Sequence, residues 1–583
     1  MKQSQKMWII FGLISIIFHI FLIFSGLVPN LVSRPLHMAL IIPWVFLYKK
    51  QNPFENIMNY IFVILGISCC LWISFNHDLL SDQYGFLEGS IQVLISITLL
   101  LIVLEMARRS VGWPLPIMSF LSLLYGIFGY LIPGEFGHPG IPINSFLGTL
   151  TIAEGGIWGT LTGVSVSIVA IFVIFGSFLN SGEAGSGFMN IATAFAGRLR
   201  GGAAKVSVIS SALFGSISGS ASANVASTGM VTLPAMIKLG YPKRLAASVE
   251  AVASSGGQIM PPLMGAGAFV MVELTGVPYN QIIIAALLPA VLFFFAVWVG
   301  IDFYSKKYDL KPIDKKDLPS NIVVLLTSFF FFVPFSILLA FMYIGFTPQY
   351  SAAVSILASF LLLFFNIDNG MDFKIGLKRF FNACLSSGNQ ISLIGSIILC
   401  ASIIIGVLSI TGLGVKLTSL IISLSGNHIW PALLLTGLAC LILGMEVPTT
   451  AAYVICVSVA GPALVDMGLE LLQVHLFIFW FALLSTITPP VCGTVFIAAG
   501  MVSENWLKVS ITSMSLGIGL YFIPLAMIAN KSIIDLNTTF VFSILAFIKI
   551  AFGLTILSYS IISKNNVILR LSGFLLSLFI MFI

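Results

Sequence analysis

The sequence contains very few charged residues. Only 8% of its 583 residues are Asp, Glu, Lys or Arg, whereas 58% are hydrophobic. A soluble domain has about a quarter of its residues charged, so this chain cannot cover an aqueous surface. The hydrophobic residues form long runs and not the short alternating segments of a transmembrane β-barrel. Because one spanning helix needs about 20 apolar residues, the sequence predicts an all-α polytopic membrane protein.

The sequence also lacks the residue patterns of common catalytic and metal sites. Its seven cysteines stand in apolar stretches without the spacing of metal ligands, and its six histidines are scattered. We therefore expect the thiols to be small buried hydrophobic groups. No HExxH motif occurs, Asp466 stands alone, and the serines have no histidine near them in sequence. A membrane-embedded enzyme would need converging acid, base or nucleophilic groups, so we predict a protein that is not an enzyme and has no catalytic residues.

The distribution of basic residues predicts an orientation. Lysine and arginine pairs at 49–50 and 108–109 fall in loops on the same side as the N-terminus, whereas the loop 76–87 has neither. The positive-inside rule then places the N-terminus in the cytoplasm. The first apolar run, 7–28, has no small-residue cleavage signature, so we expect a retained helix and not a signal peptide.

Runs of apolar residues separated by short polar loops suggest five consecutive parts. Two segments with basic residues, 186–205 and 372–388, are predicted to be amphipathic helices at the membrane interface. The parts are a four-helix membrane unit (1–110), the first half of a larger membrane unit (111–304), a lysine-rich cytoplasmic linker (305–320), the second half (321–530), and additional C-terminal transmembrane helices (531–583).

The larger membrane unit contains an approximate internal duplication. A segment rich in Gly, Ser and Asn begins at Gly215, and a Pro-Pro-x-x-Gly motif follows at 261–265. A segment rich in Gly and Thr begins at Gly444, and the same motif follows at 489–493 after almost the same interval. Small residues alone could simply allow close helix packing. That explanation does not account for two proline pairs in matching positions.

The proline pairs predict broken helices inside the membrane. A proline pair removes helix hydrogen bonds and turns the chain off the helical path. In lipid, the freed backbone groups are tolerated only where protein or a water-filled cavity satisfies them. We therefore predict two re-entrant hairpins, 207–234 and 445–467, next to broken helices at 254–265 and 485–493. Breaks in corresponding halves are typical of a midplane substrate and ion site in a transporter.

Two long segments then give a family resemblance. FAGRLRGGAAKVSVISSALFGSISGSASANVASTGMVTLP (195–234) and AASVEAVASSGGQIMPPLMGAGAFVM (246–271) resemble the large membrane subunit of tripartite ATP-independent periplasmic (TRAP) transporters. They look closest to fused permeases that work with the TAXI type of binding protein. The resemblance covers roughly 110–530, and 1–110 matches the small membrane subunit in helix count and order.

The resemblance implies a function and a mechanism. It implies an elevator-type transporter with two inverted repeats, each with a re-entrant hairpin and a broken helix, preceded by a four-helix unit. A periplasmic substrate-binding protein would deliver a small organic anion, and a sodium gradient would drive its uptake across the cell inner membrane. The resemblance implies C4-dicarboxylates, 2-oxo acids and glutamate as substrate classes. A carboxylate carrier that uses Na⁺ or H⁺ without a binding protein and a channel are the alternatives.

The candidate site residues come from the breaks and the hairpin tips. Hydroxyl and carbonyl oxygens are the ligands of hard cations, and glycine allows close approach of the backbone. Na⁺ is the expected coupling ion, and no organic cofactor is expected. Candidate Na⁺ ligands are Ser218, Gly219, Ser220, Asn224, Ser254, Ser255, Gly256, Thr449, Thr450, Thr486 and Thr488. Candidate substrate residues are Ser222, Gly257, Gln258, Pro261, Pro262, Glu446, Pro489 and Pro490.

Glu250 is a candidate coupling carboxylate. It falls one helical turn before Ser254 in a segment expected inside the membrane, where an ionisable group is functional by default. It could bind an ion, carry a proton or brace the hairpin through hydrogen bonds. No Lys or Arg stands at either hairpin tip, so the attraction for an anion would have to come from helix N-termini or from a more distant cation.

Overall fold

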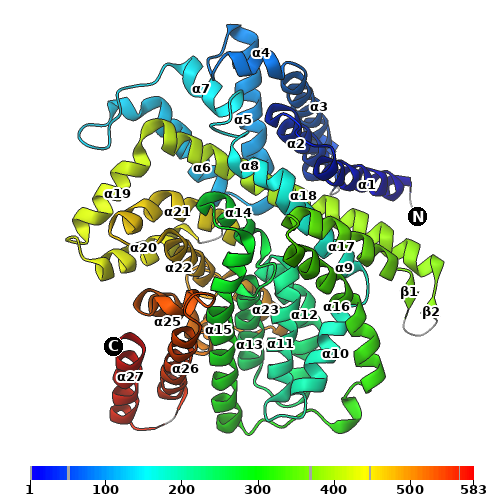
Figure 1. Ribbon diagram of the computed structural model, residues 1–583, viewed down its shortest axis with the longest axis vertical. Coiled ribbons are helices and arrows are strands. Elements are labelled where there is room, and N and C mark those ends of the chain that lie inside the picture. The colour runs from blue at the N-terminus through cyan, green and yellow to red at the C-terminus, as the bar shows by residue number, and fades with distance from the viewer. Residues whose placement is uncertain (1–2, 49–52, 367–369, 445–447, 564) are drawn as a thin grey trace. The chain divides into compact units, whose positions relative to one another are not determined.

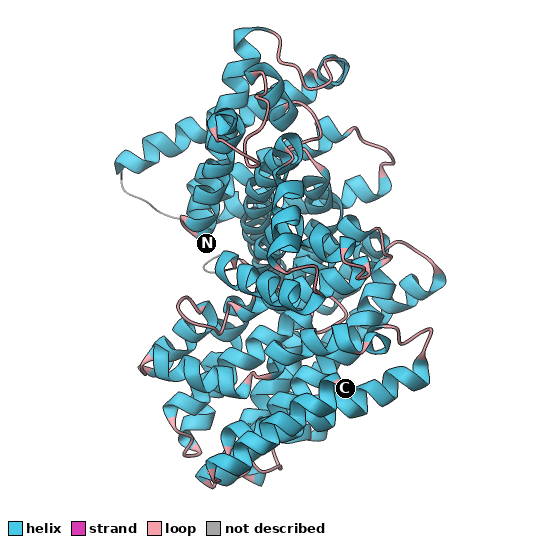
Figure 2. Ribbon diagram, turned by 90° about the vertical axis from the view of Figure 1, so that its left-hand side faces the viewer, coloured by secondary structure: helices cyan, strands magenta, loops and turns pink. Residues whose placement is uncertain are grey.

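A computed structural model covers the chain and describes all residues except 1–2, 49–52, 367–369, 445–447 and 564 (Figure 1). Helices dominate the described residues, as Figure 2 shows. The only strands in the described part are β1 (Phe365–Asn366) and β2 (Gly370–Met371), which pair antiparallel. Twelve of the described helices are long and apolar enough to cross a membrane. The prediction of an all-α polytopic membrane protein is confirmed.

The chain forms two compact units. Unit 1 contains 1–182, 333–426 and 457–463, and unit 2 contains 183–332, 427–456 and 464–583. Each unit therefore takes segments from both halves of the sequence duplication. The five parts expected from the sequence are consecutive segments, whereas each unit combines segments that are distant in sequence. The division into five parts stays a prediction.

Unit 1 holds the helices of the expected four-helix part and several that follow. Two helices are shared with unit 2: α16 (Asn321–Ile344) and α21 (Thr449–Asp466). The other helices of unit 1 are α1 (Gln3–Phe24), α2 (Asn30–Leu47), α3 (Pro53–Phe75), α4 (His77–Asp82), α5 (Gly89–Val111), α6 (Pro114–Phe128), η1 (Gly129–Leu131), α7 (Ile143–Thr151), α8 (Thr160–Val164), the π-helical turn η2 (Ser165–Val169), α9 (Ala170–Ser181), α17 (Pro348–Leu362), α18 (Phe373–Thr411) and α19 (Leu413–Leu424).

Helix α18 is the central element of unit 1. It has 39 residues and packs against α1, α2, α5, α6 and α9. The prediction of a separate interfacial helix at 372–388 is wrong, because this segment forms the beginning of the continuous helix α18. The Asp372 carboxylate caps its first turn by accepting from the Ile375 amide at 3.0 Å, and no proline interrupts it before Thr411.

A buried arginine joins α2 to the segment before α8. Arg34 Nη1 donates to the Trp158 carbonyl and lies 3.3 Å from Glu154 Oε2. Asn30 Nδ2 reaches both oxygens of the same glutamate at 2.9 Å. The expected four-helix part is thus held to the rest of unit 1 by charge-assisted hydrogen bonds.

Two buried histidines make a second joint in unit 1. His19 Nδ1 lies 2.6 Å from the Ser15 carbonyl, His19 Nε2 lies 2.7 Å from His37 Nδ1, and His37 Nε2 lies 3.1 Å from Ser165 Oγ. A carbonyl can only accept, so His19 donates from Nδ1. His37 then donates to His19, and Ser165 donates to His37. All three hydrogen bonds, from the Ser15 carbonyl to the Ser165 hydroxyl, therefore form with both imidazole rings neutral.

Unit 2 holds both proline-pair motifs. Its helices, besides the shared ones, are α10 (Ala184–Ala196), α11 (Gly202–Ser218), α12 (Ala221–Lys238), α13 (Lys243–Gly256), η3 (Gly257–Ile259), α14 (Gly265–Thr275), α15 (Tyr279–Tyr308), η4 (Lys315–Asp317), α20 (Ile429–Leu443), α22 (Leu471–Leu484), α23 (Gly493–Val502), α24 (Trp506–Leu516), α25 (Gly519–Ala529), η5 (Lys531–Ile534), α26 (Phe540–Ile562) and α27 (Val567–Phe582).

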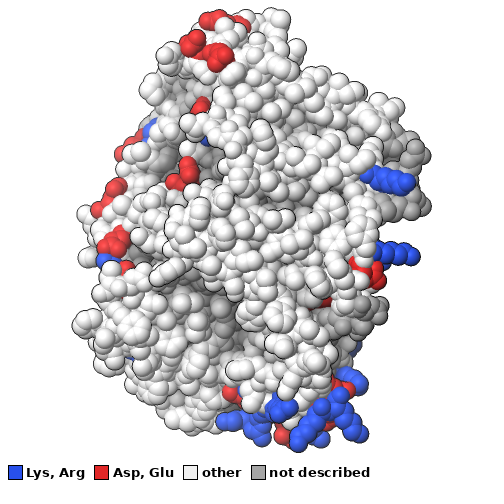
Figure 3. Space-filling model, turned by 45° about the vertical axis from the view of Figure 1, so that its right-hand side comes forward, with Lys and Arg blue, Asp and Glu red and all other residues white. Residues whose placement is uncertain are grey.

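Basic side chains gather at one end of unit 2 (Figure 3).

The prediction of one interfacial helix over 186–205 is wrong about where that helix ends. α10 stops at Ala196, and the left-handed Gly201 (φ 68°) separates it from α11. Lys205 therefore lies inside α11 and is buried. Its Nζ is 2.6 Å from Asp302 Oδ1.

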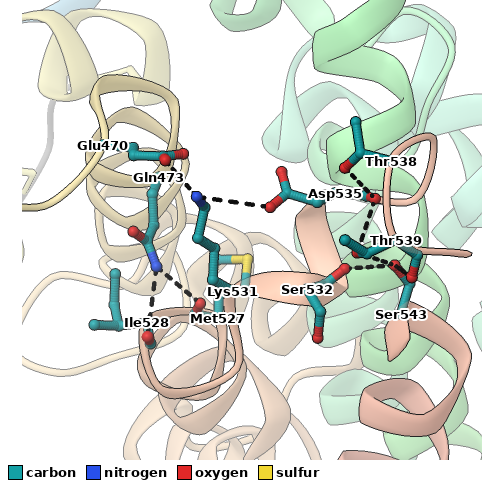
Figure 4. A network of polar contacts seen from close by, with 10 residues as sticks. All are labelled: Glu470, Gln473, Met527, Ile528, Lys531, Ser532, Asp535, Thr538, Thr539 and Ser543. Atoms are coloured by element: carbon teal, nitrogen blue, oxygen red, sulfur yellow. Dashed lines mark hydrogen bonds and ion pairs between the residues drawn. The ribbon is translucent and has the colours of Figure 1, made fainter. Parts of the chain in front are cut away.

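The opposite end of unit 2 is tied by a polar network. Lys307, in the last turn of α15 at the basic end, donates from Nζ to the carbonyl of Ile562, the last residue of α26, at 3.0 Å. The C-terminus of α26 therefore lies at the basic end, and its N-terminus, which follows η5, lies at the opposite end. There Lys531 donates to Glu470 and lies 3.9 Å from Asp535 (Figure 4). The hydrogen bond to Glu470 raises the pKa of Lys531, and burial raises the pKa of Asp535.

Candidate functional site

The first hairpin of unit 2 consists of α11 and α12, which pack against each other. Gly219 makes the turn with a left-handed backbone (φ 65°), which glycine adopts without steric cost. Ser220 is the N-cap of α12, and its hydroxyl accepts from the Ala223 amide at 3.3 Å. Ser218 Oγ lies 3.4 Å from the Ser220 carbonyl. Three of the candidate ion ligands thus shape the hairpin tip.

The first broken helix meets this tip. Helix α13 ends at Gly256, where the ring of Phe293 packs, and η3 leads to a cis Pro261–Pro262 bond. Gln258 Nε2 donates to the Gly219 carbonyl at 2.8 Å. Its other terminal atom, Oε1, is buried with no protein partner. A buried acceptor without a donor costs free energy, so this oxygen is available to a ligand.

Two glycine pairs bring the backbones into contact. A Cβ on Gly257 would lie 2.6 Å from Gly215 Cα and 2.8 Å from the Ser211 carbonyl. A Cβ on Gly265 would lie 2.8 Å from Gly219 Cα. Any side chain at these positions would collide with backbone, so the contact between hairpin and break requires glycine.

Asn224 ties the hairpin to the broken helix. Its side chain is fully buried on α12. Nδ2 donates to the Ser211 carbonyl at 2.8 Å and to the Ser254 carbonyl at 3.3 Å. One amide group therefore links α11, α12 and α13.

The second half repeats the order of helix, break and helix. α20 ends at Leu443 and α21 begins at Thr449, so the hairpin expected at 445–467 corresponds to α21 and to the residues before it that lie outside the described part. Glu446, a candidate substrate residue, lies outside the described residues. Thr449 and Thr450 begin α21, and neither forms a hydrogen bond to another described candidate residue. A cis Pro489–Pro490 bond precedes α23.

The two breaks meet at three hydroxyl groups. Thr486 Oγ1 donates to Ser255 Oγ at 2.9 Å, and Thr494 Oγ1 lies 3.3 Å from the same oxygen. Thr494 also donates to the Thr486 carbonyl at 2.7 Å. Thr488 instead contacts the Tyr521 hydroxyl at 2.6 Å. Side chains from the two halves of the duplication thus form one polar junction in the interior of unit 2.

Two helix N-termini lie close together beside this junction. Helices α12 and α23 pack against each other, and a Cβ on Gly493 would lie 3.7 Å from Ser222 Oγ. The first turn of α23 has no side-chain cap. Unpaired amides and the positive end of the helix dipole favour an anion at such positions.

Comparison with known proteins gives the family. The model of the "Tripartite ATP-independent periplasmic transporter, DctM component" matches residues 98–541, which is well over half of the chain. The chain belongs to the DctM family of TRAP transporters. The match begins near the end of the expected four-helix part and includes both breaks. The family assignment confirms the resemblance to TRAP permeases and makes the chain a multi-pass inner-membrane transporter component.

Three relatives show how much of this TRAP permease aligns with known permeases and at what sequence identity. It is 24% identical over 57% of its own length to a "C4-dicarboxylate TRAP transporter large permease protein DctM" of Pseudomonas aeruginosa, covering 76% of that protein. It is 25% identical to an "Isethionate TRAP transporter permease protein DctMQ" of Oleidesulfovibrio alaskensis, covering 67% and 62% of the two chains. It is 24% identical to the DctM protein of Rhodobacter capsulatus, covering 67% and 92%. These relatives are named as permeases, which agrees with the prediction that the chain is not an enzyme.

Sequence reasoning missed several residues of the TRAP permease site. A spacing of four residues, which puts side chains on one helix face, joins Ser207 to Ser211, Thr228 to Thr232 and Glu250 to Ser254. The hydroxyls of Ser207, Ser211, Thr228 and Thr232 contact the buried Glu250 carboxyl group. The four-residue spacing on three neighbouring helices could have identified this group. The missed residues are Ser207, Ser211, Thr228, Thr232, Thr494 and Tyr521.

Replacing Thr494 by valine is expected to loosen the junction between the breaks. Valine has nearly the same shape but loses the bonds to Ser255 and Thr486, at a cost of about 1–3 kcal/mol. The unfolding temperature of the permease in detergent should fall. Thr555→Val is the control, because that hydroxyl bonds only to the Ala551 carbonyl of its own helix at 2.8 Å. Equal unfolding temperatures of the two variants would contradict the role of Thr494.

Proposed function

We propose that this permease takes up a small organic anion together with Na⁺, with substrate delivered by a periplasmic binding protein. The junction of Ser255, Thr486 and Thr494 carries the proposal, because it joins the two breaks of a repeat-built TRAP permease in one unit. The names of the relatives support C4-dicarboxylates and isethionate as substrates to test first. A binding protein of the TAXI type is the proposed partner.

The donor set around the first break fits Na⁺. It consists of hydroxyl and carbonyl oxygens, which hard cations take as ligands. The unpartnered Gln258 Oε1 is the observation that favours a cation, since a buried acceptor requires a donor or a positive charge. Ser218, Gly219 and Ser220 at the tip, with Ser254 and Ser255 on α13, are the proposed holders. When bound, Na⁺ would supply positive charge to a site that holds an anion.

The anion is proposed to bind between the first turns of α12 and α23. Ser222 and Gly493 mark the point where these helix N-termini approach each other. The described polar contacts of Ser218, Ser220, Gln258, Thr486 and Thr488 include no Lys or Arg. Helix dipoles and Na⁺ are therefore the proposed attraction for the negative group. An elevator movement of the site between the membrane faces is the proposed transport step.

Uptake into proteoliposomes tests the proposal. The permease is reconstituted, the candidate binding protein is added outside, and radiolabelled C4-dicarboxylates, 2-oxo acids, glutamate and isethionate are screened with and without an inward Na⁺ gradient. We expect uptake only when both the binding protein and Na⁺ are present. Uptake without the binding protein would instead show a stand-alone carrier, and uptake insensitive to Na⁺ would overturn the sodium site.

A further inference from the structure

Positive charge is concentrated at the basic end of unit 2 (Figure 3). The segments 198–205, 238–244 and 302–317 contain eleven lysines and arginines and four aspartates, which gives a net charge of +7, whereas the whole chain carries +6. Seven of these basic side chains are exposed and have no hydrogen bond or ion pair with any described residue. We call them the basic surface: Arg198, Arg200, Lys238, Lys243, Lys311, Lys315 and Lys316.

One backbone contact joins the turn after α10 to the segment after α15. The Ile313 amide donates to the Gly197 carbonyl at 2.9 Å, and the Ile313 side chain packs against the buried Ala192, Ala196 and Val206. The two arginines of the turn directly follow the accepting residue, and three lysines lie within three residues of the donating one. Basic side chains from segments distant in sequence are therefore held at the same place.

Two further contacts hold the turn between α12 and α13 at this end of the unit. The Ala204 amide, near the start of α11, lies 3.5 Å from the Tyr241 hydroxyl of that turn. Arg244 Nη2, in the first turn of α13, donates to the hydroxyl of Tyr308, the last residue of α15, at 3.3 Å. The fold thus fixes all the segments of the basic surface against one another.

The aspartates of these segments do not neutralise the basic surface. Asp302 pairs with the buried Lys205 at 2.6 Å. Asp309, Asp314 and Asp317 are exposed, and within the described residues none of them forms an ion pair with the basic surface. Like charges held together in this way repel one another, and an anion from outside the chain would relieve that repulsion.

The apolar neighbours of these charges favour a lipid as the source of the anion. Leu199 is 40% exposed and stands between Arg198 and Arg200, and Phe195, at the end of α10, is 71% exposed. A soluble polyanion would leave both apolar side chains in water. A phospholipid offers a phosphate to the basic groups and acyl chains to the apolar ones, as at other interfacial helices.

We propose that the basic surface binds the headgroups of anionic phospholipids. The phosphate contacts the turn 197–201 and the segment 311–316, and the acyl chains lie against Phe195 and Leu199. The proposal does not depend on the transported substrate or the coupling ion. Phosphatidylglycerol should bind more tightly than phosphatidylethanolamine with the same chains, because the amine of the latter offsets its phosphate charge.

Native mass spectrometry of the full chain in detergent, titrated with dioleoylphosphatidylglycerol, tests the proposal. Each basic residue near an anionic surface strengthens binding about five-fold, so Arg198→Gln together with Arg200→Gln should weaken the affinity about thirty-fold. The weaker binding of dioleoylphosphatidylethanolamine should hardly change. An unaltered affinity of this double variant for the anionic lipid, or a wild type that binds the two lipids equally, would overturn the proposal.

A matched pair of lysines separates a lipid site from a response to net charge. Lys374 and Lys378 are exposed in the first turns of α18, in unit 1. Replacing both by glutamine removes the same charge and should leave the affinity for phosphatidylglycerol intact. An equal loss in both double variants would reject a site at the basic surface. Lys315→Gln together with Lys316→Gln should repeat the thirty-fold loss, which covers a failure of the arginine variant to fold.

Competition experiments identify the occupant. Inorganic phosphate or a short single-stranded DNA is added to the permease loaded with phosphatidylglycerol. Neither should displace the lipid, because neither supplies acyl chains for Phe195 and Leu199. Displacement by phosphate would instead show a site for a free anion, and displacement by the DNA would show a surface for a soluble polyanion. Either result would reject a lipid as the occupant.

Discussion

Replacing Gly257 by alanine is expected to abolish uptake by the permease. The new Cβ would lie 2.6 Å from Gly215 Cα and 2.8 Å from the Ser211 carbonyl, and backbone atoms cannot rotate away as a side chain can. Overpacking of an interior costs about 1–3 kcal/mol or more. The strain would separate the first hairpin from the broken helix, and the proposed sodium ligands lie on both. Uptake by proteoliposomes measures the loss.

A matched glycine provides the control for this result. Gly500 lies in α23 of the same unit, and a Cβ there would meet nothing within 4 Å. Alanine in a helix interior is favoured over glycine by about 1 kcal/mol, so Gly500→Ala should fold and transport normally. Full uptake by Gly257→Ala, at the level of Gly500→Ala, would show that the close approach is dispensable.

Replacing Asn224 by alanine is expected to have the second largest effect. The change removes the hydrogen bonds to the Ser211 and Ser254 carbonyls, each contributing about 1 kcal/mol, and leaves a cavity between helices. We expect a lower unfolding temperature together with a loss of the stabilisation that Na⁺ bound at the proposed site would confer. Ligand binding stabilises the folded state by mass action, so thermal unfolding with and without Na⁺ measures both.

Asn190→Ala is the comparison for Asn224→Ala. Asn190 Nδ2 donates to Thr327 Oγ1 at 3.3 Å in the same unit, between α10 and α16, which contain neither break. This variant should keep the full Na⁺ response even if its unfolding temperature changes slightly. An Asn224→Ala protein with an undiminished Na⁺ response would place the sodium site elsewhere.

The sequence predicted the helical membrane class and the location of the breaks because both depend on local chemistry. The scarcity of charge required lipid as solvent, and the proline pairs at 261–262 and 489–490 could not continue a helix. Both pairs follow helices that end a few residues earlier, at Gly256 and Leu484. The matching positions of the two breaks were visible because glycine and proline have strong local effects on the backbone.

Contacts between distant segments could not be predicted in this way. Nothing near Ser255 in the sequence indicates Thr486 or Thr494 as its neighbours, because packing of the two halves decides that junction. Lys205 shows the same limit. Its position after two arginines suggested an interfacial residue, whereas the turn at Gly201 moves it into a helix where Asp302 neutralises it.

The length of α18 has a consequence for how this polypeptide could be divided. At 1.5 Å per residue its 39 residues extend about 58 Å, nearly twice the roughly 30 Å thickness of a hydrocarbon core. Along this length it packs against α1, α2 and α5 from the beginning of the chain. The peptide bonds around residue 112 are thus not required to hold those helices in place. Two genes, one ending there and one starting there, would encode fragments able to reassemble on α18 without a covalent link.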